Sequence, residues 1–260
     1  MQGSQTMAVK ALCLTIALVV LATDCHAFVA DLGVLVPLRW QGADGAAESW
    51  AVRYAAVAAM AAHHINHRVN SLVPKAQELL PPDFKVVVDI RDSAAQPTVA
   101  VGHAVDWNEQ GKHAIVGSYR SAVTGPTALA ASIAGTPVIA WGASASSLSD
   151  RSTYPTLSRT NIHDGVTADR TIRWIKAMGW TRIAMIAVDD AWGRAFMGDA
   201  TEAAAKVGVD LALSLVYSLG DAASIEDAVS RLAQSGVGIV LCTIFHSDLL
   251  SIAYAADSHG

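Results

Sequence analysis

The sequence predicts an α/β fold made of two lobes, each built on a parallel sheet. Short apolar runs alternate with longer amphipathic segments along most of the chain. That alternation is typical of βαβ units, in which helices cover both faces of a parallel sheet. A polar stretch without hydrophobic periodicity, residues 149–161, interrupts the pattern. We expect this stretch to be the crossover between the lobes.

The first 27 residues are expected to be a signal peptide and not part of the fold. Lys10 supplies the positive charge, residues 11–22 form an apolar run, and a small-residue cleavage pattern ends at Ala27. The run is shorter than the roughly 20 apolar residues of a membrane span. An uncleaved N-terminal anchor is the alternative. The first lobe would then occupy residues 28–158 and the second lobe residues 159–260.

Four strands are expected in the first lobe, each bounded by Gly, Pro, Asp or Ser. Their signals are runs rich in Val, Ile and Leu at residues 32–38, 84–92, 113–118 and 137–142. Between them, helical patterns cover residues 46–69, 97–111 and 125–135. The first helical pattern is rich in Ala, and its large apolar residues recur near helical spacing.

The second lobe repeats the rhythm. It opens with a helix over residues 163–179, which has Asp164 near its start and Gly179 after its end. Strands are expected at residues 182–188, 211–219 and 237–245, and helices at residues 193–208, 224–236 and 248–258.

The composition of the chain limits the classes of function that we expect for it. The chain has 260 residues, a net charge of −5 and 52% hydrophobic residues, so it can bury a sizeable core, and nucleic acid is not expected as a partner. Of its three cysteines, Cys13 and Cys25 fall in the expected signal peptide. Cys242 lies in an apolar strand pattern and is expected to be a core residue, without an internal disulfide.

No motif for an enzyme or a cofactor is present. The glycine-rich nucleotide-binding patterns, the G-x-S-x-G nucleophile turn and the H-E-x-x-H zinc pattern do not occur, so we expect no enzyme activity, cofactor or metal. His63, His64 and His67 share helical spacing, which leaves a metal site as an alternative, although no Cys or carboxylate lies beside them. Asp189 and Asp190 could form an acid pair, but adjacent residues in a loop usually point apart, so a cap on the helix that follows is the expected role.

Polar, small residues follow three of the predicted strands, at residues 117–126, 139–150 and 188–195. The segment 139–150 places four serines within six residues directly after a buried strand. Ligands of open α/β sheets bind at the carboxyl ends of strands, where backbone N–H groups and hydroxyls can reach them. These loops therefore predict a polar cleft, with an ordinary Ser-rich loop and helix caps as the alternative.

Within residues 135–195, several motifs occur in a fixed order: a Pro before a strand, Trp-Gly-x-Ser, Leu-Ser-Asp, Tyr-Pro-x-x-x-Arg-Thr, Gly-Trp, and Asp-x-Trp-Gly. Together they resemble the receptor-family ligand-binding region. This is the Venus-flytrap ectodomain of metabotropic glutamate, GABA-B and natriuretic-peptide guanylate cyclase receptors, which shares its fold with periplasmic amino-acid-binding proteins. The resemblance is strong over residues 114–196 and weaker over residues 32–260.

The resemblance implies a type I periplasmic-binding-protein-like fold whose second lobe is incomplete, because the family's domain is longer than this chain. It also implies positions for a ligand pocket. Ser121 matches a serine that holds the ligand carboxylate, and the turn after the fourth strand matches a backbone contact and a hydroxyl. Asp164 matches an acid that pairs with the ligand's amino group, with a helix cap as its alternative role. The implied site residues are Trp40, Ser121, Gly142, Ser144, Asp164 and Trp192.

Two aromatic residues in this set would lie against the ligand. Trp192 occupies the place of a stacking aromatic, commonly Tyr in the family, and Trp40 is placed like an aromatic that covers the ligand. The sequence departs from the family at Arg120, where many relatives have a disulfide-bonded Cys. We expect Arg120 to be solvated at the surface, with contact to an acidic ligand as the alternative.

The resemblance predicts the ligand-binding region of a membrane receptor on the extracellular side of the plasma membrane. It would bind a small amino-acid-like ligand between its lobes and signal by lobe closure. A homodimer or heterodimer through the first lobe, and attachment to the membrane through a missing C-terminal region, are implied as well. The alternative is a soluble, periplasmic-type amino-acid-binding protein.

Overall fold

The computed structural model describes residues 29–40 and 49–259. The expected signal peptide lies outside the described residues. The chain divides into two compact units: one contains residues up to Ala143 together with Asp150–Asn161, and the other contains Ser144–Ser149 together with Ile162–Gly260. The chain passes from one unit to the other after Ala143, after Ser149 and after Asn161.

The first unit is built on a parallel sheet of five strands in the order β2-β1-β3-β4-β5. Four of the strands were expected. The fifth lies in the stretch expected to be the crossover, where no strand was expected. It is short and polar, and only Leu157 is buried, so it carries no apolar pattern. The strands are β1 (Val29–Val36), β2 (Lys85–Asp92), β3 (Ala114–Val116), β4 (Val138–Ala140) and β5 (Leu157–Arg159).

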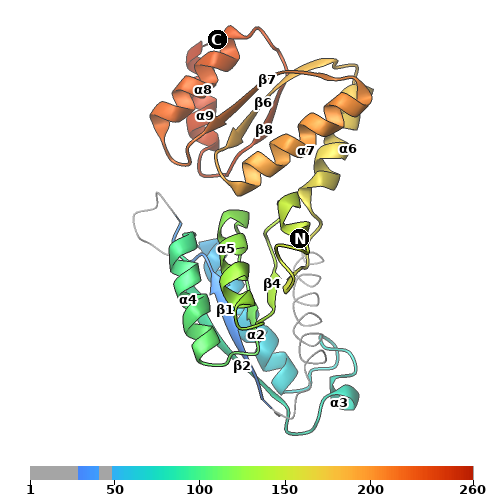
Figure 1. Cartoon of the computed structure of the whole chain (residues 1–260), viewed down its shortest axis with the longest axis vertical. Helices are drawn as coiled ribbons and strands as arrows, with labels where there is room; N and C mark the ends of the chain where they lie inside the picture. Colours follow the sequence, from blue (N-terminus) through green and yellow to red (C-terminus); the bar gives the residue numbers. More distant parts are fainter. Residues whose placement is uncertain (1–28, 41–48, 260) are drawn as a thin grey trace. The chain divides into compact units, whose positions relative to one another are not determined.

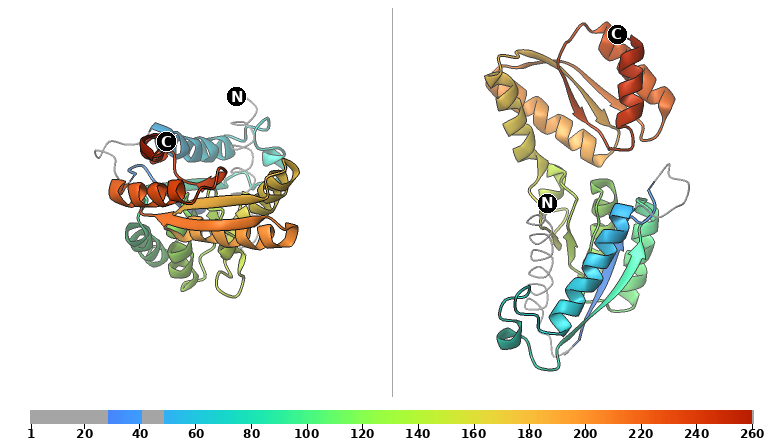
Figure 2. Two further views of the ribbon diagram at one scale, coloured as in Figure 1. Left: turned by 90° about the horizontal axis from the view of Figure 1, so that it is seen from above. Right: turned by 180° about the vertical axis from the view of Figure 1, so that it is seen from behind.

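Helices cover both faces of this sheet (Figures 1 and 2). Helix α2 (Ser49–Asn66) lays its alanines and Ile65 on one face of β1, against a cluster that includes Leu32 and Val34. Helices α4 (Pro97–Glu109) and α5 (Ser121–Ser132) lie on the other face. The opposite placement follows from right-handed crossovers, because the chain moves outward from β1 to β2 and then back across β1 to β3. A short helix, α3 (Ala76–Leu79), precedes β2 and was not expected.

The second unit contains a parallel sheet of three strands in the order β7-β6-β8. One core cluster of this unit includes Ile172 of α6, Met185 of β6 and Phe196 of α7, all of which are buried. The strands are β6 (Arg182–Val188), β7 (Asp210–Tyr217) and β8 (Val240–Thr243). The helices are η1 (Ser146–Ser149, a 3₁₀ turn), α6 (Asp164–Ala177), α7 (Ala191–Val207), α8 (Ala222–Gln234) and α9 (Leu249–His259).

The predicted α/β class with parallel sheets is thus confirmed, but one core assignment is wrong. Cys242 is exposed. It lies in β8, an edge strand of the second sheet, and its neighbour on the same face, Val240, is 37% exposed. An apolar run predicts a strand without showing how many of its faces are covered. Among the described residues, no helix has the length and apolar character needed to cross a membrane.

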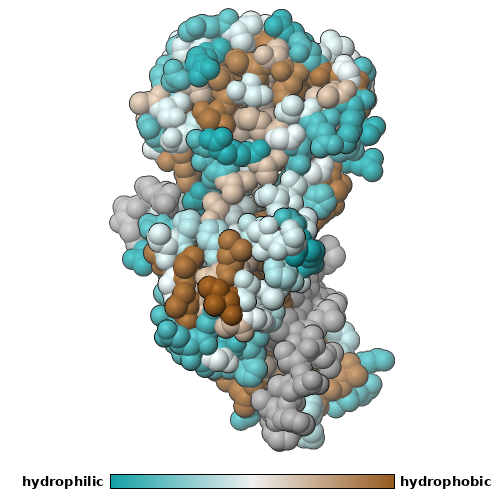
Figure 3. Space-filling model, in the orientation of Figure 1, coloured by the Kyte–Doolittle hydropathy of each residue, from teal (hydrophilic) through white to brown (hydrophobic). Residues whose placement is uncertain are grey.

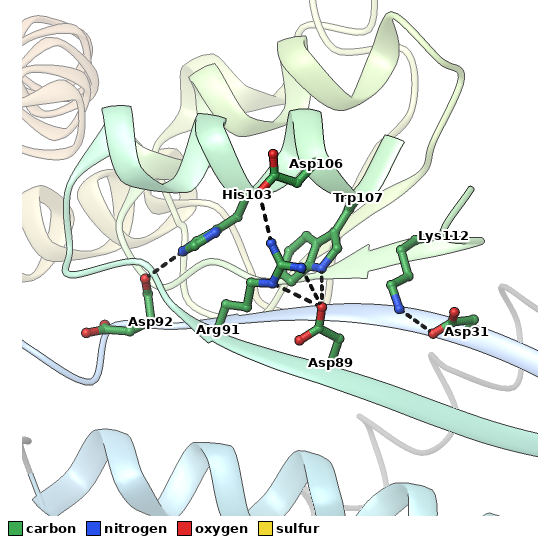
Figure 4. Close-up of polar contacts among 8 residues, drawn as sticks. All are labelled: Asp31, Asp89, Arg91, Asp92, His103, Asp106, Trp107 and Lys112. Carbon is green, nitrogen blue, oxygen red and sulfur yellow. Dashed lines mark hydrogen bonds and ion pairs between the residues drawn. The ribbon is translucent and has the colours of Figure 1, made fainter. Parts of the chain in front are cut away.

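A charged network joins β2 to α4 (Figure 4). The Trp107 ring is fully buried against β1, where a Cβ at Gly33 would lie 2.5 Å from it. Asp89 Oδ2 accepts hydrogen bonds from Trp107 Nε1 at 2.7 Å and from Arg91 Nε at 3.0 Å. The Arg91 guanidinium lies 5.1 Å from the centre of the Trp107 ring. Burial alone would raise the pKa of Asp89, but these hydrogen bonds outweigh it and the pKa is lowered.

We expect Asp89→Asn to destabilise the first unit at neutral pH and to matter less in acid. The folded-state pKa of Asp89 lies below the ordinary value of 3.8, so its contribution is complete above that value. The contribution is lost as pH falls through the folded-state pKa. Urea unfolding of wild type and variant between pH 7 and pH 3 measures this convergence. A difference that stayed constant over the range would contradict it.

Asp106→Asn is the matched control. Its carboxylate contacts the same Arg91 at 3.2 Å but is 57% exposed. Exposed ion pairs contribute little, so we expect a smaller loss of stability at every pH.

Candidate functional site

The strand order fixes where each unit can present a ligand site. In the first sheet the order reverses between β1 and β3, and in the second between β6 and β8. The loops that leave such a pair of strands run to opposite faces, which opens a crevice at their carboxyl ends. The relevant loops follow β1 and β3 in the first unit, and β6 and β8 in the second.

In the first unit, the loop after β1 is anchored by the end of β2. Asp92 Oδ1 accepts from the backbone N–H of Leu38 at 2.8 Å, and Asp92 Oδ2 accepts from Arg39 Nε at 2.6 Å. Burial acts to raise the pKa of Asp92, and these bonds, with one from the N–H of Ala94, lower it overall. The anchored loop presents Trp40, the next residue.

Trp40 is 5% exposed and belongs to an aromatic cluster. Its ring lies 5.7 Å from Trp50 and 6.0 Å from Tyr119 between centroids, in edge-on arrangements. Tyr119 in turn lies 5.4 Å from Trp141, and burial raises the pKa of its phenol. The cluster therefore joins the loops after β1, β3 and β4, and Trp40 lies in its interior.

Arg120 is not a solvated surface residue, and that expectation is wrong. It is 8% exposed, donates from Nη1 to the carbonyl of Ala95 at 3.1 Å, and lies 5.5 Å from the centre of the Trp40 ring. A guanidinium tolerates burial when an aromatic face and a carbonyl replace water. Ser121, the next residue, is 3% exposed and is the first residue of α5. The positive end of the α5 dipole is therefore at Ser121.

Gly142 lies directly beneath Tyr119. A Cβ at this position would be 2.5 Å from the Tyr119 ring and 3.0 Å from its carbonyl oxygen. Only glycine permits this approach of the turn after β4 to the loop after β3. The first unit thus brings three of the predicted residues, Trp40, Ser121 and Gly142, to the loops at the carboxyl edge of its sheet.

The second unit joins the other three predicted residues by direct hydrogen bonds. Asp164 Oδ2 accepts from Ser144 Oγ at 2.5 Å and from Trp192 Nε1 at 2.6 Å. The backbone N–H of Asp164 also donates to the Ser144 carbonyl at 2.8 Å. The carboxylate therefore links the segment before η1, the start of α6 and the start of α7. No side-chain cap closes α6 at its N-cap residue, His163.

Asp190 holds the loop that carries Trp192. Its Oδ1 accepts from the N–H groups of Trp192 at 2.9 Å and Gly193 at 3.0 Å, so the expected helix cap is confirmed. A Cβ at Gly193 would be 2.0 Å from the Val188 carbonyl oxygen, so the turn requires glycine.

Three residues near the second switch point were missed by sequence reasoning. Phe245 follows β8, and its ring centroid lies 4.9 Å from that of Trp192. Asp248 and Tyr217 are buried nearby, at 4% and 1% exposure. Phe245 and Asp248 could have been identified by applying the strand-end rule to β8 as well as β6. Nothing in the sequence distinguishes Tyr217 from an ordinary strand residue.

The alternative of a metal site at His63, His64 and His67 gains no support from the structure. His63 and His67 stack with their ring centroids 3.9 Å apart, and His67 Nδ1 bonds to the His63 carbonyl oxygen at 2.8 Å. Within the described part of the chain, no three His, Cys, Asp or Glu side chains come close enough to hold a metal ion.

Comparison with known proteins agrees with this arrangement. Residues 56–260 match the family described as receptor family ligand binding region. The taste receptor type 1 member 3 of the dog, Canis lupus familiaris, is 26% identical over 152 residues, an alignment that covers 52% of this chain. The alignment spans 17% of that receptor's own length. A mixed α/β fold with parallel sheets is consistent with the periplasmic-binding-protein-like fold expected for such a region.

We expect Ser144→Ala and Trp192→Phe to be coupled in stability. Each removes one donor from Asp164 Oδ2, so the double variant leaves a half-buried carboxylate oxygen without either bond. The double variant should lose more stability than the sum of the single losses, by about 0.5–3 kcal/mol. Urea unfolding of the four proteins measures this coupling.

The matched control combines Ser144→Ala with Trp174→Phe. Trp174 lies in α6, is 55% exposed and packs on Trp180. Its loss should be additive with that of Ser144 within about 0.5 kcal/mol. If the losses of stability were additive in the Ser144–Trp192 pair as well, Asp164 could not be the common acceptor of the two residues.

Proposed function

The chain belongs to the family of receptor ligand-binding regions, and from this premise we propose that it binds a small amino-acid-like ligand between its two lobes. One observation carries the proposal. Ser144, Asp164 and Trp192 come from separate segments that the family resemblance marks as ligand-binding. Ser144 and Trp192 both donate a hydrogen bond to the Asp164 carboxylate. A polar cluster of this kind at the carboxyl edge of a parallel sheet suits ligand recognition better than core packing.

The ligand carboxylate would be held by the first lobe. Ser121 lies at the N-terminus of α5, where the helix dipole and the first N–H groups favour an anion. The buried Arg120 adds a fixed positive charge beside it. The backbone at Gly142 would supply a further hydrogen bond. The aromatic cluster around Trp40 would form the apolar wall.

The second lobe would hold the ligand's amino end. Asp164 brings a negative charge, and the Trp192 ring brings an aromatic face that attracts cations. Binding of one ligand by both lobes would favour a closed arrangement over an open one, which is how such a domain signals. The assigned family is one of ligand-binding regions, so we expect no catalytic step.

In the intact protein we place this region on the extracellular side of the plasma membrane, as part of a longer receptor. The proposal is supported by the family and by the signal peptide expected at residues 1–27. It also accounts for an apolar surface on the first lobe. Figure 3 shows apolar side chains gathered over α4 and α5. Val105 in α4, Leu129 in α5 and Ile133 directly after α5 are 42%, 44% and 86% exposed. We propose that a second receptor chain, identical or related, covers this surface.

We expect Ser121→Ala and Ser144→Ala each to weaken amino-acid binding about 10- to 100-fold, because each removes a hydrogen bond to a charged ligand or to its carboxylate partner. Titration calorimetry of the purified protein against the twenty L-amino acids identifies the ligand and measures the loss. Ser230→Ala is the control, since Ser230 lies within α8 and bonds to Gln234. Unchanged affinity in both test variants would rule out Ser121 and Ser144 as residues of the ligand pocket.

We expect Ile133→Glu to reduce self-association of the protein. A carboxylate on the α4–α5 surface would have to be buried without a partner when two copies meet there. Sedimentation velocity over a concentration series measures the dissociation constant. Ile162→Glu, at a residue that is 61% exposed in the second unit, should leave the constant unchanged. An equal effect of both substitutions, or of neither, would exclude this surface as a homodimer contact.

A further inference from the structure

A histidine and an aspartate of the second unit border the same small space. His163 is the residue directly before α6, and Asp199 lies within α7. His163 Nδ1 and Asp199 Oδ2 are both buried, and neither atom has a hydrogen-bond partner among the described residues. Buried polar atoms in native proteins are nearly always hydrogen-bonded, so these two atoms call for an explanation.

Gly165, in the first turn of α6, keeps the space between them open. A Cβ at Gly165 would lie 3.0 Å from His163 Nδ1 and 3.4 Å from Asp199 Oδ2. The two atoms therefore approach the same point, one from the start of α6 and one from α7. A glycine inside a helix costs stability relative to alanine. At this position it leaves room for the two side chains to meet.

The Asp199 carboxylate is half-buried and has no ion-pair partner among the described residues. Such a carboxylate is unfavourable, because part of its hydration is lost and no positive charge replaces it. Asp164, in contrast, accepts hydrogen bonds from Ser144 and Trp192. Asp199 is therefore the acid near the start of α6 whose charge remains to be neutralised.

Two carboxylates are the charged groups near His163. Asp199 borders its ring from α7, and Asp164 follows it in the chain, whereas the segment Ser144–Ser149 brings no charged side chain. The remaining charged side chains of α6 and α7 lie in ion pairs or are exposed: Asp169 with Arg173, Glu202 with Lys206, Arg194 with Asp189, and the exposed Arg170 and Lys176.

A protonated His163 would satisfy both orphaned atoms. An imidazolium donates from both ring nitrogens, and imidazole is the side chain that ordinarily gains its proton in mildly acid solution. The N-terminal end of a helix disfavours a positive charge, so the imidazolium depends on the nearby carboxylates for its stability. Movement of the half-buried side chains into the space above Gly165 would bring Nδ1 and Oδ2 into contact.

We propose that uptake of one proton by His163 closes an ion pair with Asp199 across Gly165 and fastens the start of α6 to α7. The step adds one proton and forms one N–H···O bond, and it needs no other reactant. Asp164 is the next residue after His163 and holds the Trp192 indole. The same contact would therefore steady residues at the predicted ligand position in mildly acid solution.

The first test compares thermal unfolding of ligand-free wild type, His163→Gln, Asp199→Asn and the double variant at pH 8 and pH 5.5. The folded chain offers the imidazolium a carboxylate that the unfolded chain does not, so the ion pair adds stability as pH falls. We expect the midpoint of each single variant to fall by about 2–4 °C relative to wild type between the two pH values. The double variant should lose no more, because both substitutions remove the same ion pair.

Three outcomes of this comparison would overturn the contact. One is a midpoint difference from wild type that is the same at both pH values, which would show purely structural roles. Another is a pH-dependent loss in only one of the two single variants. The third is additive losses in the double variant, because two independent side chains behave in that way.

The second test fills the space above Gly165. Gly165→Ala places a methyl group between His163 and Asp199, so a further Asp199→Asn substitution should cost nothing in acid. At pH 8 the midpoint of Gly165→Ala should stay equal or rise, because alanine favours a helix.

Gly198→Ala is the matched control, since Gly198 lies beside Asp199 in α7 and a Cβ there would meet no atom within 4 Å. In this background Asp199→Asn should keep its full cost in acid. The same cost in the Gly165→Ala background would contradict the proposal.

The link between this contact and ligand binding rests on the proposed function. Titration calorimetry against the twenty L-amino acids at pH 7.5 and pH 5.5 tests it. We expect Asp199→Asn to bind as wild type does at pH 7.5 and about threefold more weakly at pH 5.5, because the site is less pre-organised. Equal affinities at both pH values would overturn the link and retain the function. An ion pair that passes the unfolding tests, in a protein that binds no amino acid, would retain the contact and overturn the function.

Discussion

Strand order is the constraint on which the rest of this structure depends. All strand pairs are parallel, so every connection must cross the sheet, and crossovers are right-handed. In each unit the chain moves one way and then returns across its first strand. The helices are thereby divided between two faces, and the loops at the reversal are left apart at the carboxyl edge. Because of the topology, Trp40 and Phe245 lie in those loops, and Ser121 and Trp192 lie in the first turns of the helices that follow them. Polar residues at those loops can then serve recognition without weakening the core.

The Asp164 carboxylate shows how the second unit uses this constraint. Its two donors come from Ser144, which directly follows Ala143 of the first unit, and from Trp192 in the first turn of α7. The bonds tie Ser144, in the short segment Ser144–Ser149, to the helices of the second unit, although residues 150–161 of the first unit lie between them in the sequence. Charge-assisted bonds of this length are stronger than neutral ones and fix side-chain orientation. The hydrogen bond to Asp164 thus holds the Trp192 ring at its N–H edge, and the ring also contacts Phe245.

Much of this could be predicted from the sequence, and the failures have physical causes. Long strands and helices were predicted because apolar periodicity extends over many residues; β6 coincides with its expected range. The polar strand β5 was missed because pairing with β4 places it, and Leu157 alone carries an apolar signal. Cys242 and Arg120 were misplaced because burial depends on what covers a face, and neighbours in sequence do not reveal that. The family motifs predict Ser144, Asp164 and Trp192 as ligand residues. They do not predict the hydrogen bonds among them, which arise from the crossing of three segments.

The two hydrogen bonds to Asp164 show why a residue at a predicted ligand position can also be structural. Asp164 Oδ2 accepts from the Ser144 hydroxyl and from the Trp192 indole N–H, so removal of its charge weakens both bonds and costs stability. The sequence places Asp164 at the start of a helix, where a helix cap is the ordinary role, and gives no sign that its donors come from two other segments. On this argument Asp164 shapes the second unit and positions Trp192.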